Sequence, residues 1–263
     1  MTKKGIQQGD IWQLGNHILG CGSSTDAEFV AKVVGEERIK CILTDPPYGV
    51  AYVEGKKDFN KLGKDDNKAI ANDHLQSEEE YIRFTKGWLD PVKENLEHYN
   101  AAYIFNSDMM FRALRTGMER AGFYYSQMII WVKNTVVIGR KDYLPMHELI
   151  AYGWFGRHKM ERSKAKSVLF HPKPSSSKLH PTMKPVGLLR KILPNSTQFG
   201  DTVYDPFGGS GSTLIACEHL GRRCIMIELD PAYVGTIIER WEKLTGKEAV
   251  IHSAARQRVS RGV

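Results

Sequence analysis

The chain has 263 residues, of which 41% are hydrophobic and 25% are charged, and its formal net charge is +7. This is the composition of an ordinary globular protein, long enough to bury a substantial core. No apolar run approaches the roughly 18 residues that a membrane-spanning helix needs, and Met1 to Gly5 contain no apolar stretch of the signal-peptide kind. We therefore expect a cytoplasmic protein without a membrane contact.

The four cysteines, at positions 21, 41, 217 and 224, show no Cys-x-x-Cys spacing. They lie in apolar or strand-like segments, where a thiol behaves as a small buried hydrophobe. We expect free thiols in a reducing compartment, with neither a disulfide framework nor a zinc site. The sequence indicates no other metal site.

Strand-like and helix-like segments alternate along the chain, as read from apolar periodicity and from glycines at helix ends. We expect strands at 11–14, 17–21, 39–43, 101–105, 123–132, 147–154, 202–205, 223–228 and 249–251, and helices at 27–34, 77–89, 109–121, 186–193, 212–220 and 232–244. This alternation predicts an α/β fold with a doubly wound, mainly parallel sheet. We expect one domain over residues 1–263, with a mobile polar loop at about 50–73.

The first segment of chemical interest is Asp45-Pro46-Pro47-Tyr48, which follows the buried strand at 39–43. Two consecutive prolines fix φ, remove two backbone donors and leave a stiff loop with free carbonyl groups. Such a loop suits a planar group with an exposed amine, because Asp45 and a backbone carbonyl accept from the amine while Tyr48 stacks on the ring. The simpler alternative is a strand followed by a proline turn with a surface tyrosine.

A second loop, from Asp205 to Gly211, joins a strand to a helix and contains three glycines. Glycines let backbone N–H groups approach a ligand, and the start of the following helix favours an anionic group. Glu228, at the end of the next strand, suits two ribose hydroxyls. The third glycine of the dinucleotide fingerprint is replaced by Leu214, so a ligand with a carboxylate and a ribose fits better than a pyrophosphate. S-adenosylmethionine carries both groups; the alternative is a glycine-rich turn without a ligand.

Most of the net charge lies between Gly156 and Lys178, where seven basic residues face Glu161 alone, a local excess of +6. The basic residues are Arg157, Lys159, Arg162, Lys164, Lys166, Lys173 and Lys178. A concentration of this kind suits a polyanion, and the alternative is a solvated loop. We interpret 156–179 as a small insertion that contacts DNA through Arg157, Lys159, Arg162, Lys164 and Lys166.

Taken together and in this order, the two loops resemble the catalytic and cofactor signatures of DNA amino-methyltransferases, in the permuted β class that has the catalytic loop first. Four further segments of this chain also resemble that class: Trp131 to Asn134, His147-Glu148, His180 to Pro185 and Glu228 to Val234. The resemblance implies S-adenosylmethionine as cofactor, DNA as partner and a bacterial or phage source, and it is compatible with a homodimer. It implies a catalytic role for Asp45, Pro46, Pro47 and Tyr48. The implied cofactor contacts are Asp205, Pro206, Phe207, Gly208, Gly209, Ser210, Gly211, Glu228, Lys184 and Ser23.

The implied reaction is methyl transfer to the exocyclic amine of a base that has flipped out of the duplex. Asp45 at the first motif position resembles the N6-adenine enzymes more than the N4-cytosine enzymes, which remain the alternative. Ser23 departs from the class, which usually has an aspartate there to hold the adenine of the cofactor, and Asp26 is a candidate substitute. The other open readings are a Rossmann-type oxidoreductase, a catalytically silent DNA-binding module, and methylation of RNA or a protein glutamine.

Overall fold

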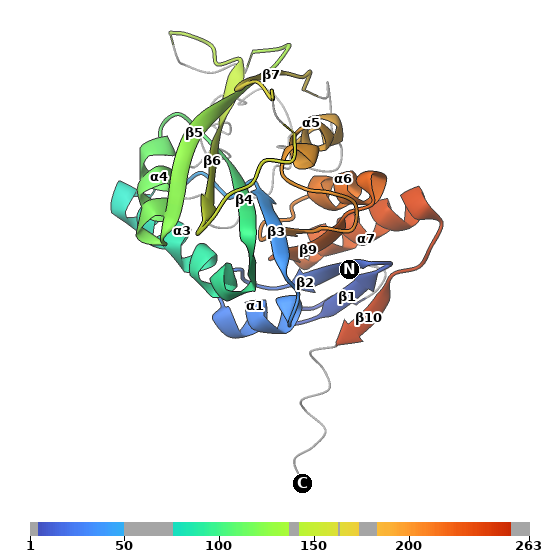
Figure 1. Ribbon diagram of the computed structural model, residues 1–263. Helices are drawn as coiled ribbons and strands as arrows, with labels where there is room; N and C mark the ends of the chain where they lie inside the picture. The colour runs from blue at the N-terminus through green and yellow to red at the C-terminus, as the bar shows by residue number, and fades with distance from the viewer. Residues whose placement is uncertain (1–4, 50–75, 137–141, 163, 174–182, 254–263) are drawn as a thin grey trace, which may run out of the picture.

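The computed structural model describes residues 5–49, 76–136, 142–162, 164–173 and 183–253 (Figure 1). The predicted loop at about 50–73 lies outside the described residues. The described strands are β1 (Ile11–Leu14), β2 (His17–Cys21), β3 (Ile39–Thr44), β4 (Leu96–Asn106), β5 (Phe123–Val132), β6 (His147–Phe155), β7 (Val168–Phe170), β8 (Thr202–Asp205), β9 (Arg223–Glu228) and β10 (Val250–Ser253). The described α-helices are α1 (Ala27–Val34), α3 (Glu78–Leu89), α4 (Phe111–Arg120), α5 (Val186–Ile192), α6 (Ser212–Leu220) and α7 (Pro231–Thr245). Short 3₁₀ helices, η1 (Asp90–Asn95) and η2 (Leu193–Asn195), follow α3 and α5.

These strands form one mixed sheet in the order β10-β1-β2-β9-β8-β3-β4-β6-β5-β7. Its centre, from β2 through β9, β8 and β3 to β4, is parallel throughout. Strand β6 runs antiparallel between β4 and β5, and β1 runs antiparallel between β2 and β10. The predicted mainly parallel α/β sheet is therefore confirmed.

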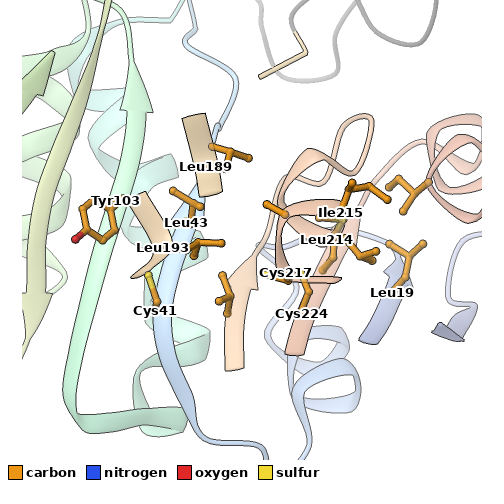
Figure 2. Packing of buried hydrophobic residues seen from close by; sticks show 14 of the residues in the cluster. Leu19, Cys41, Leu43, Tyr103, Leu189, Leu193, Leu214, Ile215, Cys217 and Cys224 are labelled. Atoms are coloured by element: carbon orange, nitrogen blue, oxygen red, sulfur yellow. The ribbon is translucent and has the colours of Figure 1, made fainter. Parts of the chain in front are cut away.

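Helices cover both faces of the sheet, which makes the fold doubly wound (Figure 1). The period of two along the strands produces two separate cores. On β3, Cys41 and Leu43 join the cluster that contains residues of α5, α6 and α7 (Figure 2). Ile42 joins the opposite cluster, with residues of α1, α3 and α4. All four cysteines are buried free thiols, as predicted.

Local signals fix the helix ends within about two residues of the predicted positions. Ser77 and Glu80 form a capping box at the start of α3, and the carboxylate of Asp26 accepts from two amides at the start of α1. Gly221 and Gly246 end α6 and α7 in the left-handed region, which glycine adopts without strain. Among the described residues, no helix has both the length and the apolarity needed to cross a membrane.

Strand β7 was not expected, because Val168 to Phe170 is too short to show a period and lies in the basic segment. It pairs in parallel with the end of β5, with Val168 beside Ile130 and Phe170 beside Val132. Backbone pairing with an otherwise open edge strand satisfies N–H and C=O groups that a loop would leave to water. The basic segment is thus partly built into the sheet.

Candidate active site

Four neighbouring parallel strands end at one edge of the sheet, and each end carries a predicted site residue. Asp45 follows β3, Asp205 ends β8, Glu228 ends β9, and Ser23 follows β2 by two residues. With strands about 4.8 Å apart, these four ends span about 15 Å. Ligands of open α/β sheets bind outside such carboxyl ends. The topology therefore places the predicted catalytic loop and the predicted cofactor residues along one continuous edge.

The loop after β3 meets a lysine that is distant in the sequence. Tyr48 donates its hydroxyl hydrogen to Asp45 Oδ1 at 2.7 Å, and Lys184 Nζ donates to Asp45 Oδ2. Lys184 Nζ also lies 3.2 Å from the Tyr48 hydroxyl and 5.6 Å from the centre of its ring. Lys184, predicted as a cofactor contact, is therefore bonded to the predicted catalytic residues.

Glu148 and Lys133 extend the contact between Lys184 and Asp45 toward β6 and β5. Glu148, on β6, accepts from Lys184 Nζ at 3.1 Å through Oε2 and from Lys133 Nζ at 2.6 Å through Oε1. Lys133 directly follows β5, and both lysines are less than 10% exposed. The result is a buried row of alternating charge, Lys133–Glu148–Lys184–Asp45. Glu148 and Lys133 were not predicted as site residues.

The alternation of charge offsets the cost of burying these groups. Burial alone would raise the pKa of Glu148, but Lys184 and Lys133 outweigh burial and lower it to about 2. Burial raises the pKa of Asp45 against the opposing effect of Lys184. Burial, with Asp45 and Glu148 nearby, raises the pKa of Tyr48 well above its ordinary value. Tyr48 is therefore a neutral hydroxyl donor at physiological pH, and Asp45 is the more basic of the two carboxylates.

The two predicted loops touch through a buried hydrogen bond. Thr44, the last residue of β3, donates its hydroxyl hydrogen to Asp205 Oδ1 at 2.7 Å. The same oxygen accepts the Phe207 amide at 3.1 Å. Burial is the main cause that raises the pKa of Asp205, to about 7. This bond fixes the start of the glycine loop directly against the end of the strand that delivers Asp45.

The glycine loop lies tightly against β9 and α7. A Cβ at Gly208 would stand 2.8 Å from Met226, and one at Gly211 would stand 3.0 Å from Ile237. Gly211 has a φ of 80° and precedes α6 without a side-chain cap. Larger residues would push the loop outward, so glycine keeps the first N–H groups of α6 at the sheet edge. The Phe207 ring packs edge-on against Trp88, with centroids 5.5 Å apart.

Glu228 is buried at the end of β9, where it braces the same loop. Its Oε2 accepts the Gly209 amide at 2.7 Å, and its Oε1 accepts the Asp230 amide at 2.8 Å. Burial raises its pKa to about 7, although these amides oppose the shift. The arrangement leaves a carboxylate with further lone pairs beside the glycine loop, as a ribose diol requires.

Ser23 and Asp26, the two candidates for holding the adenine of the cofactor, differ in the hydrogen bonds that they already make. The Ser23 hydroxyl lies 2.8 Å from that of Thr25 and accepts the Thr25 amide at 3.3 Å. Asp26 Oδ1 caps α1 by accepting the amides of Glu28 and Phe29. The Gly22 amide donates to the carbonyl of Glu228 at 2.9 Å, which keeps this turn beside the predicted ribose residue. Ser23 is thus the half-buried polar side chain next to Glu228, while Asp26 already has a structural role.

The basic segment starts at the opposite edge of the sheet. The carbonyl of Arg157 accepts the Asn100 amide, and Arg157 forms an isolated parallel β-bridge with Tyr99 near the start of β4. Tyr99 precedes Ile104, the partner of Thr44, by five residues, or about 17 Å along the strand. The chain then returns along β5 through β7 toward the site edge. Arg157 and Lys159 therefore lie far from Asp45. Lys166 precedes Ser167, whose carbonyl accepts the Ile130 amide, and Ile130 is level with Asn106 at the site-edge end of β4.

Sequence reasoning missed Glu148 and Lys133 because neither belongs to a compact motif. Both were present in segments with a noted resemblance, 131–134 and 147–148. The available signal was a charged residue beside a strand terminus, near the start of β6 for Glu148 and just after β5 for Lys133, because a charge among buried neighbours normally needs a partner. In the described part of the chain, no cluster of His, Cys, Asp and Glu could hold a metal ion.

Comparison with solved structures identifies the fold. The structure is similar to that of the M1.HpyAVI–SAM complex, with a TM-score of 0.62 and 24% identity over 84% of this chain and 98% of that one. It is also similar to the cytosine-N4-specific PvuII DNA methyltransferase, with a TM-score of 0.68 and 19% identity over 89% of this chain and 92% of that one. The fold is that of the S-adenosylmethionine-dependent DNA methyltransferases.

Sequence comparison then defines the family. A family model for N6 and N4 DNA methylases matches residues 39–239, so the chain belongs to this family of S-adenosylmethionine-dependent DNA amino-methyltransferases. It is 26% identical to the type II methyltransferase M.HpaI of Haemophilus parainfluenzae over 236 residues, 80% of this chain and 70% of the relative. It is 27% identical to M.HinfI of Haemophilus influenzae over 242 residues, 81% of this chain and 66% of the relative. The chain thus spans about two thirds of the length of these relatives.

Proposed function

We propose that the chain transfers a methyl group from S-adenosylmethionine to the N6 amine of an adenine that has flipped out of DNA. The observation that carries the proposal is the buried Thr44–Asp205 hydrogen bond of 2.7 Å, which joins the Asp45 loop to the glycine loop. A base held at the first loop would face a cofactor held at the second. Such a fixed approach of two reactants accounts for much of the rate of an in-line transfer.

The residues at the edge of the sheet fit the cofactor. Glu228 would accept two hydrogen bonds from the ribose, and the α6 start, which has no side-chain cap, would receive the anionic carboxylate. Ser23 lies beyond Glu228, where the adenine of the cofactor would follow. The cofactor supplies a methyl group on a positively charged sulfur.

The Asp45 loop would prepare the amine of the target base. An exocyclic amine is a weak nucleophile because its lone pair is delocalised into the ring. Asp45 and the carbonyl of Pro46 would each accept one N–H, which favours a pyramidal and more nucleophilic nitrogen. Asp45 would also be the first acceptor for the proton that the nitrogen loses after methylation, as its raised pKa suits. Pro46 and Pro47 would hold these acceptors rigid.

The Tyr48 ring would stack on the flipped base. Lys184 Nζ lies 5.6 Å over this ring, so one side of the ring already faces a cation and the base would use the other. Exposed cations of the basic segment, Lys164 and Lys166 among them, would contact phosphates of the duplex.

The choice of adenine over cytosine depends on Asp45 at the first motif position. Both bases offer an amine beside a ring nitrogen, so the geometry of the loop accepts either. N4-cytosine methylation is the second candidate, favoured by the similarity to the PvuII enzyme, which is cytosine-N4-specific.

The test is incubation of DNA with methyl-labelled S-adenosylmethionine, followed by digestion to nucleosides. We expect label in N6-methyl-2′-deoxyadenosine. Label in N4-methyl-2′-deoxycytidine would support the second candidate, and DNA without label would contradict both.

The first mutational prediction concerns Asp45→Ala. Loss of the carboxylate removes one acceptor of the amine, and we expect a loss of methyl transfer of about a hundred- to a thousandfold, of the order seen when preorganised charge stabilisation is removed. The affinity for S-adenosylmethionine, measured by calorimetry, should remain within about threefold because Asp45 faces the base. An Asp45→Ala variant as active as the wild type would exclude this role.

A further inference from the structure

Lys184 is the centre of the polar network in the catalytic site. An ammonium group has three N–H donors, and the three acceptors around Lys184 Nζ are Asp45 Oδ2, Glu148 Oε2 at 3.1 Å and the Tyr48 hydroxyl at 3.2 Å. The residue is 7% exposed. Every donor of the group is therefore directed at the side chains that line the base-binding loop.

Glu148 has a corresponding position between two cations. Its two oxygens are divided between Lys133 and Lys184, and Tyr48 lies 3.3 Å from Oε2. Lys133 is 5% exposed, and its ammonium lies 5.1 Å from the centre of the Trp131 ring. A buried carboxylate between two buried lysines fixes the place of each lysine, because moving either one would leave an unpaired charge.

We propose that Lys184 belongs to the catalytic site and that Lys133 and Glu148 are positioning residues that act through Lys184 on Asp45. This inference rests on the proposed function. Lys184 holds Asp45 in its acceptor orientation and favours its ionised form. Glu148 has the opposite electrostatic effect, because it shares the ammonium and adds a second negative charge. Lys133 in turn weakens the effect of Glu148.

The other groups near Asp45 and Tyr48 are few in the described part of the chain. Asp205 of β8 is linked to the end of β3 through Thr44, and Tyr81 of α3 interacts electrostatically with Tyr48. Neither is a cation. Lys184 is therefore the positive group in direct contact with Asp45 among the described residues, and its removal should dominate the titration of this carboxyl.

The inference predicts opposite changes in two variants. In Lys184→Met, Asp45 becomes harder to ionise, so activity requires a higher pH. We expect the ratio of kcat/KM at pH 8 to kcat/KM at pH 6 to be about tenfold larger in this variant than in the wild type. In Glu148→Gln, the competing negative charge is gone and the ammonium turns wholly to Asp45, so kcat/KM should fall less than in the wild type over the same interval. Lys133→Met should resemble Lys184→Met, with a smaller effect.

The experiment measures methyl transfer to DNA from pH 5.5 to 9, with cofactor affinity by calorimetry for each variant. Lys184→Arg retains the charge and should restore most of the wild-type profile. Lys86→Met and Glu119→Gln, at exposed ion pairs on α3 and α4, are matched controls and should leave the profile unchanged. Binding of the cofactor by each variant shows that it has folded.

The outcomes separate the two proposals. If the wild type transfers no methyl group to DNA, the proposed function fails. If the wild type is active but Lys184→Met and Glu148→Gln shift the profile in the same direction, or not at all, the positioning inference is overturned. A Lys184→Met variant that loses cofactor affinity while retaining the wild-type pH profile would assign Lys184 to the cofactor, which also overturns it.

Discussion

At the scale of single residues, the site depends on acids whose surroundings make them unequal. Glu148, between two lysines, has its pKa lowered to about 2, whereas Glu228, surrounded by backbone amides, has its pKa raised by burial to about 7. The first is a fixed negative charge at any physiological pH. The second changes its ionisation near neutrality, at the position proposed for the ribose. Cofactor binding should therefore depend on pH through Glu228.

We predict that affinity for S-adenosylmethionine rises by about tenfold from pH 6 to pH 8 in the wild type, because the diol donates to the ionised carboxylate. Glu228→Gln should bind more weakly and lose this dependence. Calorimetry at four pH values measures it, with Glu239→Gln on the exposed side of α7 as the control. Asp205 has a raised pKa of similar size and remains in the variant. A dependence that persists in Glu228→Gln would assign the effect to another group and contradict the ribose role.

At the scale of elements, β7 determines where the cations of the basic segment lie on the molecule. Because Val168 to Phe170 pairs in parallel with β5, the basic segment runs from the edge of the sheet near Tyr99 toward the edge that carries Asp45. Positive charge is thus spread along the outer strands and does not form one patch beside Asp45. Lys159 also has an acidic neighbour, with Nζ 3.6 Å from Glu161.

We therefore predict different contributions from two pairs of cations. Replacing Lys164 and Lys166 by glutamine should lower the salt slope of DNA binding by up to about 1.8, or 0.9 for each phosphate contact. Replacing Arg157 and Lys159 should lower it less, because that pair lies at the far edge and is partly neutralised. Titrations of a labelled duplex at several salt concentrations measure both slopes. Equal slopes in the wild type and both double variants would make the segment solvated surface.

At the scale of the whole molecule, a buried histidine joins the sheet to two helices. His17 of β2 accepts the Cys224 amide at Nδ1 and lies 2.8 Å from Glu218 of α6 through Nε2. Trp241 of α7 donates to the same Glu218 oxygen at 2.9 Å. The acceptor role of Nδ1 requires neutral imidazole with its hydrogen on Nε2. Burial lowers the pKa of His17 below its ordinary 6.5, although Glu218 opposes this shift.

This predicts a pH-dependent stability. Above pH 6.5 His17 is neutral in both states, and its network contributes fully. Below pH 6.5 the unfolded chain gains a proton that the folded chain resists, so stability falls by at most about 1.4 kcal/mol per pH unit. His17→Asn should be less stable at pH 8 but should lose less between pH 7 and pH 5. Urea unfolding at each pH measures the difference, with exposed His219→Asn as the control. Parallel stability curves for His17→Asn and the wild type would contradict it.

The sequence by itself determined the order of the two loops and the helices and strands other than β7, because caps, glycines and strand periodicity act over a few residues. It also placed Asp45, Asp205 and Glu228 at the ends of strands. Only the tertiary structure decided that β3 lies beside β8, which brings Thr44 and Asp205 together across 161 positions. Such pairing depends on strand order and register, which local patterns do not contain.

The same reason separates what was found from what was missed in the site. Lys184 belongs to a recognisable motif, but its partner Asp45 is set by the packing of the chain before α5 against the Asp45 loop. Glu148 on β6 and Lys133 just after β5 lie 15 residues apart in the sequence, and the pairing of β5 with β6 brings them together beside Lys184. Spacing along the chain identifies residues that can do chemistry. Their charges act on one another through distances of a few ångström, and those distances are set by the fold.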